Sequence, residues 1–110
     1  MTLSTKQKAD LAELVLALST GDYAKISAKA WLGRTTVDDL KRVISEYGNT
    51  LTSPPNNFLD FSDAFALDND FAMLIDIPLW TKEEGRSDLM VSVEINLAKK
   101  TISINDLRVP

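Results

Sequence analysis

The chain contains no cysteine and no histidine among its 110 residues. It therefore cannot form a disulfide, a thiolate or imidazole zinc site, a cysteine nucleophile or a Ser-His-Asp triad. The side chain that most often serves as a general base is also missing. Its four glycines are isolated from one another, so no glycine-rich phosphate loop is present. We expect a protein that is not an enzyme and that uses no cofactor and no metal.

Long apolar runs are lacking as well. The apolar stretch from Leu11 to Leu18 is interrupted by Glu13, is too short to cross a bilayer and is followed by no cleavage motif. We therefore predict neither a signal peptide nor a membrane anchor. Together with the absence of cysteine, which fits a reducing compartment, this favours a cytoplasmic protein.

Acidic residues are abundant and unevenly placed. The net charge is −4, and residues 51–110 carry ten acids against five bases. The segment 60–84 contains seven acids and one base: Asp60, Asp63, Asp68, Asp70, Asp76, Glu83 and Glu84, with Lys82. Such a field repels nucleic-acid phosphates and attracts a protein with a basic surface. Simple solubility is the alternative interpretation of the same charges.

The first 48 residues have helical periodicity. Leu11, Leu14, Val15 and Leu18 form one apolar stripe. Capping residues and glycines divide the region into three predicted helices: one from Ser4 or Thr5 to Gly21, one from Asp22 to Gly33, and one from Thr36 to Gly48. Residues 49–56 follow as a turn-rich connector containing Pro54 and Pro55, and residues 57–70 are expected to form a strand or an extended loop.

The last forty residues alternate between apolar and polar side chains. Residues 71–80 and 89–98 each keep a period of two, which is typical of half-buried strands. A third strand is predicted over 101–109, with a bulge near Asn105 and Asp106 because the alternation changes phase there. One face of the sheet is apolar, and the other carries Asp76, Trp80, Ser92, Glu94, Asn96, Thr101 and Ser103.

Helices that precede strands in the chain indicate an α+β fold. We expect residues 1–110 to form a single domain, in which a helical part (1–48) packs on one face of an antiparallel meander (57–110). A cystatin-like or nuclear-transport-factor-like arrangement of helix on curved sheet fits this order. Asp76 and Glu94 would then share one face of adjacent strands, where paired carboxylates could act as acid and base.

The segment Thr81–Ser87 is predicted to be a polar loop between two long strands. One interpretation is structural: Glu83, Glu84 and Asp88 pair with Lys82 and Arg86, with Arg86 as a bidentate donor. The other is functional: the loop presents Arg86 beside Trp80 for recognition, since tryptophan and arginine are enriched at binding hot spots. The sequence leaves both open.

The same segment resembles the signature of a family of small bacterial proteins. The shared residues are Leu79-Trp80, the run from Glu83 to Leu89, and Asp106-Leu107-Arg108-Val109, with a helix end similar to Glu46-Tyr47-Gly48. The similarity covers about residues 40–110 and implies no particular activity. In size, acidity and lack of catalytic groups, the chain also resembles immunity proteins of contact-dependent growth inhibition systems.

That resemblance implies a protein that binds and neutralises a cognate toxin domain, such as a nuclease, and that is a monomer or a weak homodimer. We expect the partner to contact Asp60, Asp63, Asp68, Asp70, Asp76, Trp80, Glu83, Glu84, Arg86 and Glu94. Two alternatives stay open. The chain could be a small-ligand binder or enzyme with a pocket near Trp31 and Tyr47, or a homodimeric accessory protein that pairs through its open sheet face.

Overall fold

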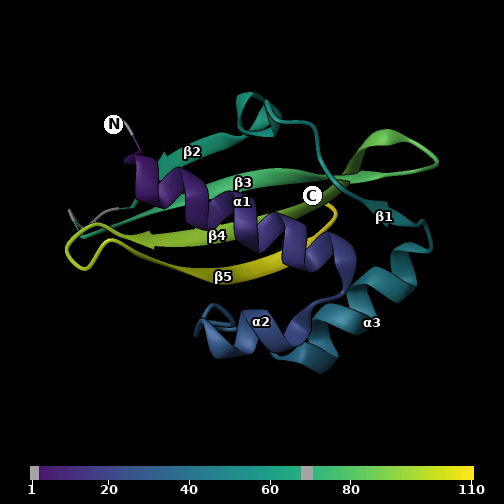
Figure 1. Ribbon diagram of the computed structural model, residues 1–110, viewed down its shortest axis with the longest axis horizontal. Helices are drawn as coiled ribbons and strands as arrows, with labels where there is room; N and C mark the ends of the chain where they lie inside the picture. The colour runs from purple at the N-terminus through teal and green to yellow at the C-terminus, as the bar shows by residue number, and fades with distance from the viewer. Residues whose placement is uncertain (1–2, 68–70) are drawn as a thin grey trace.

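The computed structural model describes residues 3–67 and 71–110, and it has an α+β architecture (Figure 1). Its helices are α1 (Thr5–Thr20), α2 (Tyr23–Ala28), α3 (Val37–Tyr47) and the short 3₁₀ helix η1 (Phe58–Phe61). Its strands are β1 (Leu51–Thr52), β2 (Asp63–Ala66), β3 (Ala72–Thr81), β4 (Gly85–Asn96) and β5 (Thr101–Arg108). The expected fold class, with helices first and an antiparallel sheet after them, is confirmed.

Side-chain caps define where the helices begin. Ser4 and Gln7 form a reciprocal capping box at the start of α1, in which the Ser4 amide donates to Gln7 Oε1 at 2.8 Å. Asp22 accepts from the Lys25 amide at the start of α2, and Thr36 accepts from the Asp39 amide at the start of α3. The positions predicted from the sequence are thus the observed caps.

All strand pairs in the sheet are antiparallel. Strands β3, β4 and β5 form a meander, and β1 and β2 pair with two different stretches of the same edge of β3. The predicted bulge near residue 105 is present: Ser92 pairs with Asp106 and Val93 with Ile104, so Asn105 is the extra residue. This sheet places alternate side chains of β3, β4 and β5 on a core face and an outer face.

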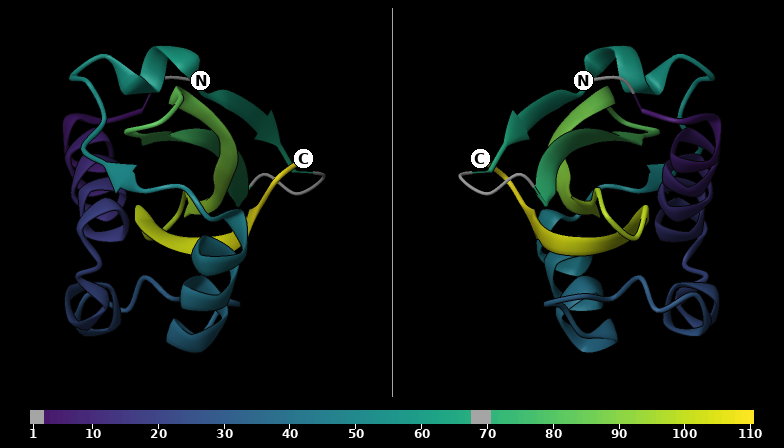
Figure 2. Two further views of the ribbon diagram at one scale, coloured as in Figure 1. Left: turned by 90° about the vertical axis from the view of Figure 1, so that its right-hand side faces the viewer. Right: turned by 90° about the vertical axis from the view of Figure 1, so that its left-hand side faces the viewer.

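The helices lie on the concave face of the sheet. Figure 2 shows the strands curving around α1, while α2 and α3 lie below β5 in Figure 1. The Leu11, Leu14 and Leu18 stripe of α1 is fully buried in one cluster with the core-facing residues of the sheet, among them Ile77 and Val91. Burial of each such side chain contributes about 1.5–3 kcal/mol, so this layer contact is a principal source of stability.

The segment between α2 and α3 covers the outer edge of β5. The Ile104 amide donates to the Trp31 carbonyl at 2.7 Å, and the Arg34 amide donates to the Ile104 carbonyl at 3.2 Å. Gly33 lies between them at φ +56°, and a Cβ atom there would stand 2.4 Å from the Ile104 oxygen. An edge that would otherwise expose unpaired backbone groups is therefore protected.

Three sequence predictions differ from the structure. The second helix ends at Ala28, five residues before Gly33, because Ala30 adopts φ +59° and Trp31 leaves the helix to pair with β5. Residues 57–67 form η1 and then strand β2, so the expected strand is present over 63–66, whereas residues 58–61 are a 3₁₀ helix in place of extended chain. The predicted seven-residue loop Thr81–Ser87 is a tight turn at 82–84, because Thr81 belongs to β3 and Gly85–Ser87 to β4.

Candidate functional site

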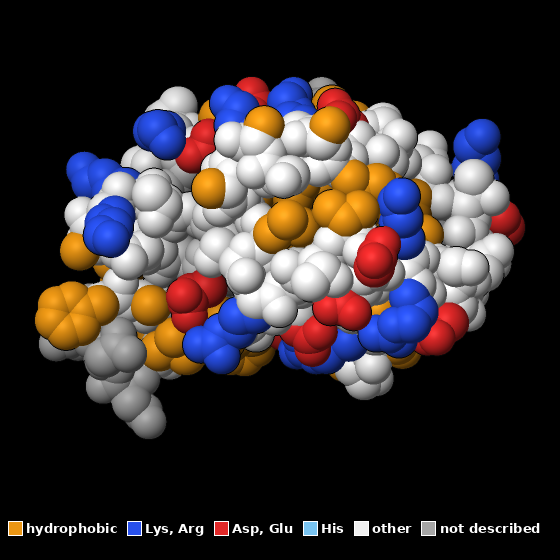
Figure 3. Space-filling view, turned by 90° about the horizontal axis from the view of Figure 1, so that it is seen from below, with side chains coloured by type: hydrophobic (Ala, Val, Ile, Leu, Met, Phe, Trp, Pro, Cys, Tyr) orange, Lys and Arg blue, Asp and Glu red, His pale blue; other side chains and the backbone are white. Residues whose placement is uncertain are grey.

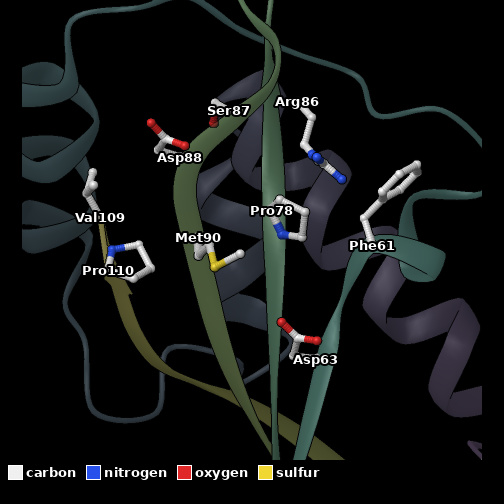
Figure 4. Close-up of a pocket in the computed structure, with 9 residues that line it drawn as sticks. All are labelled: Phe61, Asp63, Pro78, Arg86, Ser87, Asp88, Met90, Val109 and Pro110. Carbon is white, nitrogen blue, oxygen red and sulfur yellow. The ribbon is translucent and has the colours of Figure 1, made fainter.

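An open groove of about 570 Å³ lies on the outer face of the sheet, on the side away from α1, α2 and α3 (Figure 4). Strands β3 and β4 form its floor, while η1, β2 and the C-terminal residues border it. Its lining residues are Phe61, Asp63, Pro78, Arg86, Ser87, Asp88, Met90, Val109 and Pro110. We refer to it below as the outer-face groove.

An aromatic and cationic stack borders the groove. The rings of Phe61 and Trp80 meet edge to face, with centroids 5.7 Å apart, and the Arg86 guanidinium lies 4.8 Å from the Phe61 centroid. Trp80 and Arg86 are cross-strand partners in β3 and β4, so the sheet register places them side by side. Phe61 is brought to them by η1. Within the described part of the chain, Arg86 has no ion-pair partner, which corrects the interpretation of it as the donor of an internal ion pair.

The floor of the groove is apolar and is set by the register of β3 and β4. Pro78 faces Met90 across this strand pair, and both side chains point into the groove in Figure 4. Along the edge of β3 that faces away from β4, Pro78 lies between the stretch that pairs with β2 and the stretch that pairs with β1. A proline is tolerated there because no neighbouring strand needs its missing amide hydrogen.

A row of polar side chains, three of them carboxylates, crosses the same outer face. Its members are successive cross-strand partners from β2 to β5: Asp63, Asp76, Ser92 and Asp106. Arg108 reaches over β4 to Asp76 at 3.3 Å and also lies 3.8 Å from Asp106. The Asp76 side chain, 14% exposed, is therefore neutralised by an arginine within the protein. Asp63 is left on the border of the groove without such a partner among the described residues.

The tip of the β3–β4 turn is fastened to the region between α3 and β1. Glu83 accepts hydrogen bonds from the amide and hydroxyl of Thr50 at 2.8 and 3.0 Å. The Tyr47 hydroxyl donates to Glu84 at 2.6 Å and accepts from the Asp88 amide. The Thr50 amide lowers the pKa of Glu83, whereas desolvation and the bond to Glu84 raise the pKa of Tyr47. These two glutamates have a structural role.

The predicted partner-binding residues therefore fall into separate groups. Asp63, Asp76, Trp80, Arg86 and Glu94 share the outer face or its border, whereas Glu83 and Glu84 lie at the turn and Asp60 lies on η1. Asp68 and Asp70 are outside the described residues. Seen from below in Figure 3, acidic and basic side chains are interspersed. On that view the acids do not form a continuous patch.

Several groove residues were missed by the sequence reasoning, including Phe61, Asp88 and Met90. Phe61 was hidden because the periodicity of residues 57–70 fitted both helix and strand. Met90 had a usable signal: it is an apolar side chain at a polar-face position of a regular, alternating strand. Asp88 was considered only as an ion-pair partner within the turn.

The pocket near Trp31 and Tyr47 was not found in the predicted form. Trp31 is buried against β5, and Tyr47 is bonded to the β3–β4 turn, so no groove described for residues 3–67 and 71–110 is lined by both. Asp76 and Glu94 do lie on one face, two positions apart across the β3–β4 pair, but Asp76 forms an ion pair with Arg108.

Among residues 3–67 and 71–110, no group of three or more potential ligands could hold a metal ion, and no helix has the length and apolarity to cross a membrane.

Fold and site together define a small α+β domain with helices on one sheet face and an aromatic-bordered groove on the other. The chain belongs to the family described as Domain of unknown function (DUF7668), whose model matches residues 15–110. No curated protein and no solved structure matches the chain. The family match covers every strand, α2, α3 and the whole groove, so these features lie within the family's domain.

Proposed function

We propose that this chain is a non-catalytic domain that binds another protein through the outer-face groove. The observation that supports this most is the stack of Phe61, Trp80 and Arg86 on a sheet face that α1, α2 and α3 leave uncovered. Aromatic residues, methionine and arginine are the types enriched in protein interfaces, and contiguous exposed apolar patches mark interaction sites. Phe61, Phe65 and Val109 are each at least 40% exposed.

Arg86 is prepared for a role in recognition. Its guanidinium is held over the Phe61 ring and has no carboxylate partner among the described residues, so its hydrogen-bond donors are available to a partner. Asp63 and Asp88 line the same groove and supply negative charge next to it. A partner that presents an acceptor opposite Arg86 and basic groups opposite these aspartates would be complementary to this surface.

The more specific form of the proposal is that the domain is a cytoplasmic immunity protein that neutralises a cognate toxin domain. Its support is the resemblance to such proteins in size and acidity, together with a chain that contains no histidine and no cysteine. Outward-facing acids such as Asp63 and Asp88 would contact a basic toxin surface. The tests below separate general protein binding from this particular role.

The binding test uses the product of the adjacent upstream gene. We expect it to form a complex with the wild-type chain and the Arg86→Gln variant to bind at least about tenfold more weakly, as at a hot spot. Arg42→Gln is the matched control, because Arg42 is an exposed arginine of α3 far from the groove. Equal affinities for the two variants would remove the groove from the proposal. An upstream product that is not toxic when it is expressed without this chain, or whose toxicity this chain does not relieve on co-expression, would remove the immunity role.

The acidic component of binding has its own test. The double variant Asp63→Asn/Asp88→Asn should slow association with that partner at low salt, and the difference should disappear at high salt. The variant Glu13→Gln/Asp38→Asn removes the same charge from the helical side and serves as the control. If both double variants associate at the same rate, net charge accounts for the effect and the groove carboxylates do not.

A further inference from the structure

A second groove, distinct from the outer-face groove, lies between the start of α1, the end of α2 and the beginning of β5. It has a volume of about 470 Å³ and is lined by Lys6, Asp10, Lys29, Ala30, Trp31, Lys99, Thr101, Ile102 and Ser103. The two grooves share no lining residue. We call this one the lysine groove.

The lysine groove is positively charged although the protein as a whole carries −4. Three lysines and one aspartate line it, and they come from segments that are far apart in the sequence. In Figure 3, several Lys and Arg side chains lie at the left-hand end of the molecule, which in Figure 1 carries the β4–β5 turn, and others lie elsewhere on that face. The fold therefore assembles a local basic site that the overall composition conceals.

Several donors in the groove are free to bind a ligand. Lys99 has no ion-pair partner in the described part of the chain, and the hydroxyls of Thr101 and Ser103 have no hydrogen-bond partner there either. Lys29 lies 5.9 Å from the centroid of the Trp31 ring and forms a long ion pair with Glu13 at 3.9 Å, in which both charged side chains are about half exposed to solvent. Lys6 is the one lysine with a short ion pair, to Asp10 at 2.8 Å.

The local helix and backbone also suit an anion. The first turn of α1 contains no acid and carries Lys6, so the positive end of the helix dipole adds to the lysine field. The only two non-glycine residues described with positive φ are Ala30, which lines the groove, and Lys100, which lies between Lys99 and Thr101. Such backbone conformations are enriched at ligand sites.

We propose that the lysine groove binds a small anion that carries several phosphate groups. Lysine ammonium groups act as point charges that suit tetrahedral phosphate, whereas a planar carboxylate is best matched by the arginine fork, and no arginine lines the groove. Lys29 and Lys99 line the groove from the end of α2 and from the β4–β5 turn, and Thr101 and Ser103 are neutral donors beside them. The volume suits a ligand of small-molecule size. This proposal goes beyond the protein-binding role and does not depend on it.

The test is a calorimetric titration of the full chain with inorganic tripolyphosphate at low and at physiological salt. We expect saturable binding that Lys29→Gln and Lys99→Gln each weaken by roughly three- to tenfold, the scale of one partly exposed charge contact. Lys82→Gln is the control, because Lys82 lies in the β3–β4 turn at the other end of the sheet. In amide NMR spectra, the shift changes should centre on Ala30, Trp31, Thr101 and Ser103.

Equal weakening by Lys82→Gln and Lys99→Gln would overturn the proposal, since it would indicate diffuse attraction to any lysine. A hexaglutamate peptide and a ten-nucleotide single strand are titrated in parallel. If either binds more tightly than tripolyphosphate with the same dependence on Lys29 and Lys99, the site belongs to a polymer and a small phosphate ligand is ruled out. Thermal unfolding of each variant checks that its fold is unchanged.

Discussion

At the scale of single residues, Gly33 is the glycine, among the four in the chain, whose surroundings leave least room for a side chain. Its φ of +56° disfavours any L side chain, and a Cβ atom would stand 2.4 Å from the Ile104 oxygen and 3.0 Å from Ser103 Cβ. We predict that Gly33→Ala destabilises the protein by about 2–5 kcal/mol in urea unfolding, through backbone strain and overpacking together. Gly85→Ala is the control: φ is +75° but the space is open, so about 1–2 kcal/mol is expected. Similar losses would mean that β5 moves to admit the methyl group.

Glu83 makes stability depend on pH. Its pKa is lowered from 4.5 in the folded protein, chiefly by the Thr50 amide, so the ionised form stabilises the fold. That contribution is complete above pH 4.5 and is lost as the pH falls through the lowered pKa. We predict that urea midpoints between pH 7 and pH 3 fall more for the wild type than for Glu83→Gln. Glu94→Gln, whose carboxylate has no described hydrogen-bond partner, should follow the wild type. Parallel curves for all three proteins would contradict the role of Thr50.

At the scale of elements, α1 shows how one helix divides its leucines between core and solvent. Leu14 is fully buried, whereas Leu16 is 46% exposed. We predict that Leu14→Ala costs about 3 kcal/mol of unfolding free energy, because it leaves a cavity under the helix. Leu16→Ala should cost less than about 0.5 kcal/mol. A large loss for Leu16→Ala would indicate that this side chain is covered in solution, for example by a second copy of the chain.

The sequence could predict those elements that depend on local periodicity, but not those that depend on contacts between distant residues. Stripes such as Leu11–Leu18 and the alternation of residues 89–98 depend on local periodicity, so the helices, the meander and the bulge at Asn105 were recognisable. Residues 57–67 were not, because Phe58 and Phe61 fit either period, and in the fold Phe58 is buried in the core while Phe61 stacks on Trp80. The groove depends on register: Pro78 faces Met90, and Arg86 lies on Phe61 instead of pairing with an acid. Register and long-range stacking cannot be read from spacing in one chain.

At the scale of the whole molecule, the protein separates its charges and its surfaces. The outer face combines apolar side chains with carboxylates and Arg86, and the glutamates of the turn at 82–84 are bonded within the protein. Lysines from α1, from the residue after α2 and from the β4–β5 turn meet in a separate groove. Net charge alone therefore misrepresents what each surface can bind. The net charge of −4 conceals both a basic groove and two glutamates whose carboxylates already accept hydrogen bonds within the protein.

The sheet is also uneven in how firmly its strands are held, and hydrogen exchange can measure this. Strand β4 is paired along both sides and carries the buried residues Leu89, Val91, Val93 and Ile95, whereas all four residues of β2 are exposed and pair only with β3. We predict that β4 amides exchange only through global unfolding, while β2 amides exchange many times faster through local opening. If β2 were as protected as β4 at high protein concentration and lost that protection on dilution, a second copy would be covering its free edge. The chain would then act as a homodimer paired through β2, and light scattering over the same dilution would show the change in mass.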